Sequence, residues 1–206
     1  MQKVIICTTV IFLNLFIGTA SADFLTNGNF DSGLSGWTAE KDAQITQNDF
    51  WDAYGMEGNF AQLGGKTRTQ NGSIYQTFDV AGYSRLSFSF NWFFTAADTN
   101  PDKNAVFLSF LDYNNGDPIK DVTLQRITSK NLALGGIVND TFYTVVDISG
   151  VSNLTIRFDL KDRASTYPLA GIDNVVVKAV PEPSTMLLFG VGLAGLTAIT
   201  RKKRKN

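Results

Sequence analysis

The sequence contains no histidine, one cysteine and only five prolines in 206 residues. Without histidine, the chain has no Ser-His-Asp or Cys-His catalysis, no histidine ligand for a metal and no imidazole that titrates near neutral pH. A single cysteine, Cys7, forms neither an internal disulfide nor a four-cysteine zinc site. The chain does have 18 glycines and 16 phenylalanines, and 12% of it is aromatic. This composition is typical of a folded, β-rich protein that is not an enzyme.

Residues 1–22 have the pattern of a secretory signal peptide. Lys3 supplies a short positive region, an apolar run follows over residues 4–17, and Ala20-Ser21-Ala22 is a small-x-small cleavage site. An uncleaved anchor helix is the alternative, but the run is short for one. We therefore expect export through the secretory translocon and cleavage before Asp23. Cleavage removes Cys7, and a chain without thiols suits an oxidising exterior.

Residues 181–206 combine three features in a fixed order. Pro181-Glu182-Pro183 comes first, residues 184–200 carry no charge, and residues 201–206 hold five basic side chains. The uncharged segment is at the lower limit of length for a membrane-spanning helix. The basic tail is expected to remain on the cytoplasmic side.

This ending resembles the PEP-CTERM sorting signal, in which the Pro-Glu-Pro motif precedes a hydrophobic helix and a basic cluster. The resemblance implies recognition and processing by a membrane-embedded exosortase, in bacteria that often make exopolysaccharide or biofilm. A plain C-terminal membrane anchor is the alternative and gives the same topology. Both interpretations place the globular part at the cell surface or in the extracellular matrix, anchored transiently or permanently through residues 184–200.

The segment between the two ends, residues 23–180, is predicted to be one acidic domain. Of the 19 acidic residues only Glu182 lies outside it, and of the 18 basic residues Lys3 and five in the tail do. The segment therefore carries 18 acids and 12 bases, a net charge of −6, against −1 for the whole chain. Without a basic stripe, nucleic acid is not an expected partner.

Strand patterns dominate this segment. Apolar and polar residues alternate over residues 86–94 and 154–160, which is the period of a half-buried strand. Turn clusters such as Asn71-Gly72 and Ser149-Gly150 separate the candidates. The further candidate strands are residues 74–80, 106–111, 121–128, 142–148 and 172–177. Eight to ten short strands without a long amphipathic helix predict an all-β, two-sheet jelly-roll sandwich.

Three short motifs resemble those of galactose-binding-like jelly rolls, which include several carbohydrate-binding modules. The first runs from Leu25-Thr26-Asn27-Gly28-Asn29-Phe30-Asp31 to Gly36-Trp37. The second is residues 72–78, and the third is Gly171-Ile172-Asp173-Asn174-Val175. In that family a structural calcium often lies where the first strand meets the last, and the matching positions are Asp31 and Asp173.

Calcium takes about six to eight oxygen ligands, which suits these carboxylates. Asp31 stands where many members of the family have glutamate, so its reach is one methylene shorter. The alternative is that Asp31 caps a turn and Asp173 bonds to the backbone. A second acidic stretch, residues 112–117, resembles part of an EF-hand loop, but Thr123 occupies the position of the closing glutamate, and a β-turn is the expected structure.

Sugar binding needs an aromatic platform with polar groups beside it. Trp51 and Tyr54 lie in a polar, glycine-containing segment, and Tyr113 and Tyr167 lie in turn-rich segments. These four are the candidate ligand-binding residues, with packing at the edge of the core as the alternative for the first two.

Three functions follow from these patterns. The first is a non-catalytic structural protein of the envelope or biofilm matrix. The second is a carbohydrate-binding module for extracellular polysaccharide. The third is a small glycan hydrolase, but no motif marks two of the many carboxylates as a catalytic pair.

Overall fold

The computed structural model describes residues 23–65, 71–96, 105–114, 120–132, 136–162, 167–181 and 190. The predicted signal peptide, Glu182, Pro183, the basic tail and all of the hydrophobic segment except Gly190 lie outside these residues. In the part of the chain that the structure describes, no helix has the length and apolar character needed to cross a membrane.

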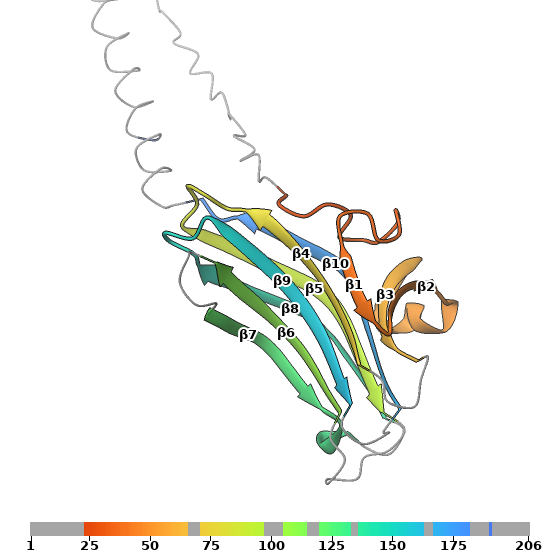
Figure 1. Ribbon diagram of the computed structural model, residues 1–206. Coiled ribbons are helices and arrows are strands. Elements are labelled where there is room, and N and C mark those ends of the chain that lie inside the picture. The colour runs from red at the N-terminus through yellow and green to blue at the C-terminus, as the bar shows by residue number, and fades with distance from the viewer. Residues whose placement is uncertain are drawn as a thin grey trace, which may run out of the picture.

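The described residues form ten strands in two five-stranded antiparallel sheets that face one another (Figure 1). The front sheet has the order β1-β4-β9-β6-β7, and the rear sheet has the order β2-β3-β10-β5-β8. The strands are β1 Thr38–Lys41, β2 Ala43–Gln47, β3 Asn59–Gly64, β4 Gly72–Asp79, β5 Arg85–Ala96, β6 Ala105–Asn114, β7 Lys120–Thr128, β8 Ile137–Asp147, β9 Asn153–Asp162 and β10 Pro168–Ala179. Two 3-10 helices lie between strands that are consecutive in sequence, η1 Asp49–Tyr54 between β2 and β3 and η2 Ser129–Asn131 between β7 and β8. The predicted two-sheet jelly-roll sandwich is therefore confirmed.

The core lies between the sheets and is built from the alternating positions found in the sequence. On β5 the inward residues run from Leu86 to Phe94, and on β9 they run from Leu154 to Leu160, all at most 4% exposed. Phe90 of the rear sheet meets Phe158 of the front sheet edge to face, with ring centroids 4.9 Å apart. Large aromatic rings bury much area each, so this interior supplies most of the hydrophobic stabilisation.

The first sequence motif holds the N-terminal segment against the sandwich. The side-chain amide of Asn27 donates to the carbonyl of Gly33, its carbonyl oxygen accepts from the backbone of Ser32, and the Trp37 indole donates to the backbone carbonyl of Asn27. Phe30 is fully buried. This motif is therefore structural, because its polar groups close the loop and its aromatic residues fill the core.

The second and third motifs hold this segment through hydrogen bonds. The side chain of Gln76 accepts from the Thr26 backbone N–H at 2.8 Å and donates to the Thr26 carbonyl at 3.0 Å, as a neighbouring strand would. The Val175 N–H donates to the Gly28 carbonyl at 2.9 Å. A Cβ on Gly28 would collide with the Val175 carbonyl oxygen, so only glycine fits there.

Candidate functional site

The predicted platform residues Trp51 and Tyr54 lie on η1, which packs on the outer face of the rear sheet. Asn48 caps this helix by accepting from the Phe50 N–H, and Gly55 ends it in the left-handed region. The Trp51 ring stacks on Phe93 with centroids 4.0 Å apart and is 8% exposed, in a second hydrophobic cluster. One face of Trp51 is thus occupied by Phe93 of this second cluster, while Tyr54 is half-buried beside it.

Tyr113 and Tyr167 lie at opposite ends of the sandwich. Burial raises the pKa of Tyr113, and the nearby negative charge of Asp147 adds to the shift. Asp147 pairs with Arg85, the first residue of β5, so Tyr113 lies near that end of the sandwich. Tyr167 is 50% exposed and immediately precedes Pro168, which pairs with Ala96, the last residue of β5. These two tyrosines therefore do not form one site with each other.

The two predicted calcium ligands lie near each other where the first motif meets β10. Asp173 is 1% exposed and accepts two hydrogen bonds from Asn174. Burial raises the pKa of Asp173 to about 7, the backbone hydrogen bond from Asn174 opposes the shift, and the negative charges of Asp31 and Glu57 add to it. Asp31 is exposed and accepts from the Asn29 amide at 2.6 Å.

These carboxylates fit calcium only in part. In the ranges that the structure covers, no three or more histidine, cysteine, aspartate or glutamate side chains are grouped to hold a metal ion. However, Asp173 is a buried carboxyl whose neighbouring charges are also negative, and a divalent cation would relieve that repulsion. The chemistry of the donors suits calcium, whereas the carboxylates that the structure describes here do not make up a group of three.

A different set of side chains converges on the outer face of the front sheet. Strand register places Tyr75 of β4, Arg157 of β9 and Phe110 of β6 side by side in one row across three neighbouring strands. The row begins with Thr38 of β1 and ends with Thr123 of β7. Neighbouring strands are about 4.8 Å apart, so the two aromatic residues lie about 10 Å apart across Arg157.

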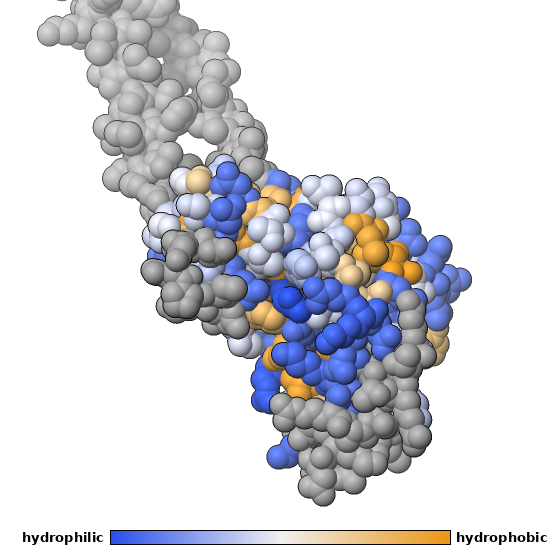
Figure 2. Space-filling model, in the orientation of Figure 1, coloured by the Kyte–Doolittle hydropathy of each residue, from blue (hydrophilic) through white to orange (hydrophobic). Residues whose placement is uncertain are grey.

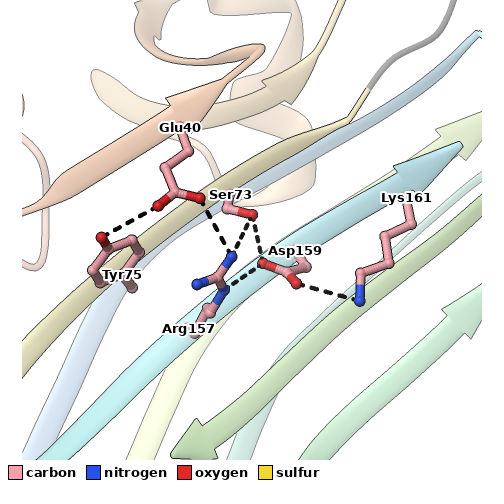
Figure 3. Close-up of polar contacts among 6 residues, drawn as sticks. All are labelled: Glu40, Ser73, Tyr75, Arg157, Asp159 and Lys161. Carbon is pink, nitrogen blue, oxygen red and sulfur yellow. Dashed lines mark hydrogen bonds and ion pairs between the residues drawn. The ribbon is translucent and has the colours of Figure 1, made fainter.

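The adjacent row supplies the charged partners of Arg157 (Figure 3). The Arg157 Nε donates to Asp159 Oδ1 at 2.8 Å, and its Nη2 lies 3.1 Å from Ser73 Oγ and 3.5 Å from Glu40 Oε2. The Lys161 Nζ lies 3.6 Å from the second oxygen of Asp159. The network therefore joins three strands and balances two acids against two bases.

The aromatic ring of Tyr75 completes this network. The guanidinium carbon of Arg157 lies 5.2 Å from the centre of the ring, within the range of a cation–π contact. The Tyr75 hydroxyl donates to Glu40 Oε1 at 3.3 Å. Burial alone would lower the pKa of Arg157, but the hydrogen bond and charge of Asp159 and the charge of Glu40 raise it overall. The guanidinium is thus held charged and in a fixed orientation.

This outer face is mainly hydrophilic, with smaller hydrophobic areas among the polar residues (Figure 2). Fixed hydrogen-bonding groups beside aromatic rings are the arrangement that binds sugars, because the rings pack on the apolar faces of a sugar and the polar groups bond its hydroxyls. Sequence analysis missed this set because its members come from strands far apart in the chain. The sequence did contain one signal, because Tyr75 and Arg157 alternate with the apolar residues of the later β4 and β9 and so were expected to point outward.

Comparison with solved structures agrees with the fold. The carbohydrate-binding module TmCBM61, solved with β-1,4-galactotriose, superposes with a TM-score of 0.52 at 11% identity, over 78% of this chain and 100% of its own. The enzymatically active domain of tailspike protein 4 from bacteriophage CBA120 gives 0.51 at 15% identity, over 77% of this chain and 21% of its own. A family 16 carbohydrate-binding module gives 0.48 at 12% identity, over 75% and 98%. The domain is thus a jelly-roll sandwich similar to those of carbohydrate-binding modules.

The C-terminal region defines the second feature of the protein. Residues 179–204 match the PEP-CTERM protein-sorting motif, which confirms the resemblance seen in Pro181-Glu182-Pro183 and the segments after it. The chain is therefore an exported protein with a C-terminal sorting signal, of the kind that an exosortase processes. No curated protein sequence matches the chain.

Proposed function

We propose that this exported protein is a non-catalytic carbohydrate-binding protein that attaches to extracellular polysaccharide at the cell surface or in a biofilm matrix. The proposal rests on the row of Tyr75, Arg157 and Phe110 on the outer face of the front sheet. The sorting signal supports export, which is a condition for contact with extracellular polysaccharide.

The charges of the face argue against an anionic glycan. Glu40 and Asp159 are matched by Arg157 and Lys161, and Asp112 adds a further negative charge that acts on Arg157, so the face has no excess positive charge to attract an anionic polymer. Sugar hydroxyls both donate and accept, which suits a mixture of carboxylates and amines. An uncharged polysaccharide lying across the strands is therefore the proposed ligand.

The same contacts argue against hydrolysis. A glycosidase needs one carboxylic acid to protonate the leaving group and a second carboxylate across the scissile bond. Here both Glu40 and Asp159 are bound to the guanidinium of Arg157. Their oxygens serve to orient that group, and a small glycan hydrolase is the less favoured alternative.

Binding to an insoluble or gel-embedded polysaccharide tests the proposal. Full-length protein is compared on β-1,4-galactan, on xylan and on the exopolysaccharide of its own host. We expect Phe110→Ala and Tyr75→Ala to weaken retention at least tenfold, while Tyr83→Ala, an aromatic change at a 40% exposed position in the turn before β5, leaves it unchanged. Melting curves establish that each variant is folded.

The results separate the alternatives. Loss of binding in Tyr54→Ala but not in Phe110→Ala would move the platform to η1. Retention on none of the three polysaccharides would contradict carbohydrate binding and leave a structural matrix role. Release of reducing ends by the purified protein would show a hydrolase instead.

A calcium ion held by Asp31 and Asp173 is a further part of this proposal, with a structural role away from the sugar face. It is supported by the buried carboxyl of Asp173 beside two other negative charges. If an ion binds, chelation should lower the melting temperature at pH 7.5, and Asp173→Asn should abolish that response. An unchanged melting temperature on chelation would contradict the site.

A further inference from the structure

The four strands at the edges of the two sheets differ in how they are protected against pairing with another chain. The strands β1 and β2 are only 4 and 5 residues long, and β1 ends on Lys41. The strand β7 has a bulge in its pairing with β6 and carries Arg126. Short length, basic residues and bulges are the devices by which natural proteins block sheet edges.

The remaining edge strand, β8, is neither short nor bulged and carries no basic residue, and its one protective feature is the inward-pointing carboxylate of Asp140. It is 11 residues long and, among the strands that the structure describes, pairs only with β5, without a register shift, from Arg85 opposite Asp147 to Thr95 opposite Ile137. Its sequence, IVNDTFYTVVD, has no proline, lysine or arginine and is rich in β-branched residues. A long, regular edge of this composition is well suited to accept another strand.

One antiparallel register, centred on Phe142, brings the inward apolar residues of two β8 strands together. If a second β8 pairs antiparallel with Phe142 opposite Phe142, Val138 faces Val146 and Asp140 faces Thr144 on the inward side. On the outward side Asn139 faces Val145 and Thr141 faces Tyr143. On the inward side valine pairs with valine and a carboxylate with a hydroxyl, and no two acids stand opposite each other, so the inward side of the register is self-complementary.

The inward residues of this register are only partly covered in a single chain. Val138, Phe142 and Val146 are half-buried against the core, and the Phe142 ring stacks on Phe90 with centroids 4.8 Å apart. Tyr143 is 67% exposed on the outer face. A second copy of β8 would place its own Val146, Phe142 and Val138 beside these side chains and extend the inner apolar layer.

We propose that β8 is a self-association edge, through which two copies of this chain join their rear sheets antiparallel about a two-fold axis at Phe142. The occupant is a second copy, because the side-chain register pairs with itself. The interface is small, one strand from each copy, so the dimer is weak and forms where the chain is concentrated at a surface. The Asp140 side chain accepts from the Thr141 N–H at 2.8 Å. When β8 pairs with a second strand, a backbone bond to that strand must replace this local bond.

Cysteine cross-linking tests the register directly. In the full chain carrying Cys7→Ser, one tagged copy carries Asn139→Cys and a differently tagged copy carries Val145→Cys. The register places these residues directly opposite each other, about 4.5–5.5 Å between Cα atoms, which is within disulfide range. Two copies of Asn139→Cys would lie about 20 Å apart and cannot bond. Gln47→Cys, exposed on the short edge strand β2, is the control.

We expect mild oxidation to give a disulfide-linked heterodimer from the mixture at several-fold the yield of either variant alone or of Gln47→Cys. Adding Tyr143→Lys to both copies should lower that yield several-fold, because the two lysines would lie near the two-fold axis and repel each other. Ser32→Lys, an exposed change of the same charge, should not. A mixture that yields no more dimer than the single variants, or equal effects of the two lysine substitutions, would overturn the proposal. The sugar-binding face is on the other sheet, so loss of one activity leaves the other measurable.

Discussion

The carboxyl of Asp173 makes the stability of the domain depend on pH. Its pKa is about 7 in the folded chain, mainly because of burial, against an ordinary value of 3.8. The folded state therefore binds this proton more tightly than the unfolded state does. The stabilisation is complete below about pH 4 and is lost as the pH rises through about 7.

Replacing Asp173 with asparagine should remove this dependence. With chelator present, we expect the free energy of unfolding of the parent protein to fall between pH 4 and pH 7, and that of Asp173→Asn to fall much less. Urea denaturation at several pH values measures both. Asp52→Asn, which changes an exposed carboxyl on η1, should retain the slope of the parent protein. A slope that survives in Asp173→Asn would assign the titration to another group.

Trp51 is expected to act through packing. Its ring stacks on Phe93 in the cluster with Met56 and Phe60, so Trp51→Ala should cost about 3–5 kcal/mol of unfolding free energy. Phe50 on the same helix is 60% exposed, and Phe50→Ala should cost less than about 1 kcal/mol. Chemical denaturation compares the two, and an equal cost would show that the Trp51 ring is not anchored in the core.

The segment before β1 depends on one side chain of β4. Gln76 satisfies both backbone groups of Thr26, and it is itself buried. Gln76→Leu keeps the volume but leaves a donor and an acceptor unpaired, which should cost about 2–4 kcal/mol. Protease cleavage within residues 23–37 should become faster. Thr77→Leu, on the exposed neighbour, is the control, and equal cleavage of the two variants would contradict the role of Gln76.

Long elements were predictable from the sequence, whereas short ones were not. The alternating patterns of residues 86–94 and 154–160 correspond to β5 and β9, because a strand with one buried face imposes a period of two. The strands β1 to β3 and the helix η1 were not predicted. Each is at most 6 residues long, and η1 forms through the cap of Asn48 and the packing of Trp51 rather than through a helical pattern.

The candidate sugar face could not be predicted because it depends on register between distant strands. Glu40, Tyr75 and Arg157 meet only because β4 pairs with both β1 and β9. Each of these residues alone is an ordinary polar residue on a strand. The motifs that the sequence does display, around Asn27 and Gln76, mark how the sandwich is closed rather than what it binds.

At the scale of the whole molecule, both ends of the domain lie at the same end of the sandwich. Asp23 forms a bridge with Lys178, and the Val180 N–H donates to the Arg85 carbonyl at 3.0 Å. The described residues next to the predicted signal peptide and next to the sorting signal therefore lie at the same end of the domain. Val180 makes the last of these backbone bonds before the Pro-Glu-Pro motif. We therefore expect that substitutions in the motif leave the stability of the domain unchanged.

Substituting Pro181, Glu182 and Pro183 together with alanine tests this separation. We expect the melting temperature to stay within about 1 °C, because Pro181 is exposed and lies after Val180, while processing by the exosortase is lost. Intact-mass measurement of the protein from its own host should then show the basic tail retained in the variant and removed in the parent. Alanine at the exposed residues Ser32 and Ser35 serves as the control and should be processed normally. Removal of the tail from the triple-alanine variant at the parental rate would show that the enzyme reads the hydrophobic segment and the basic residues alone.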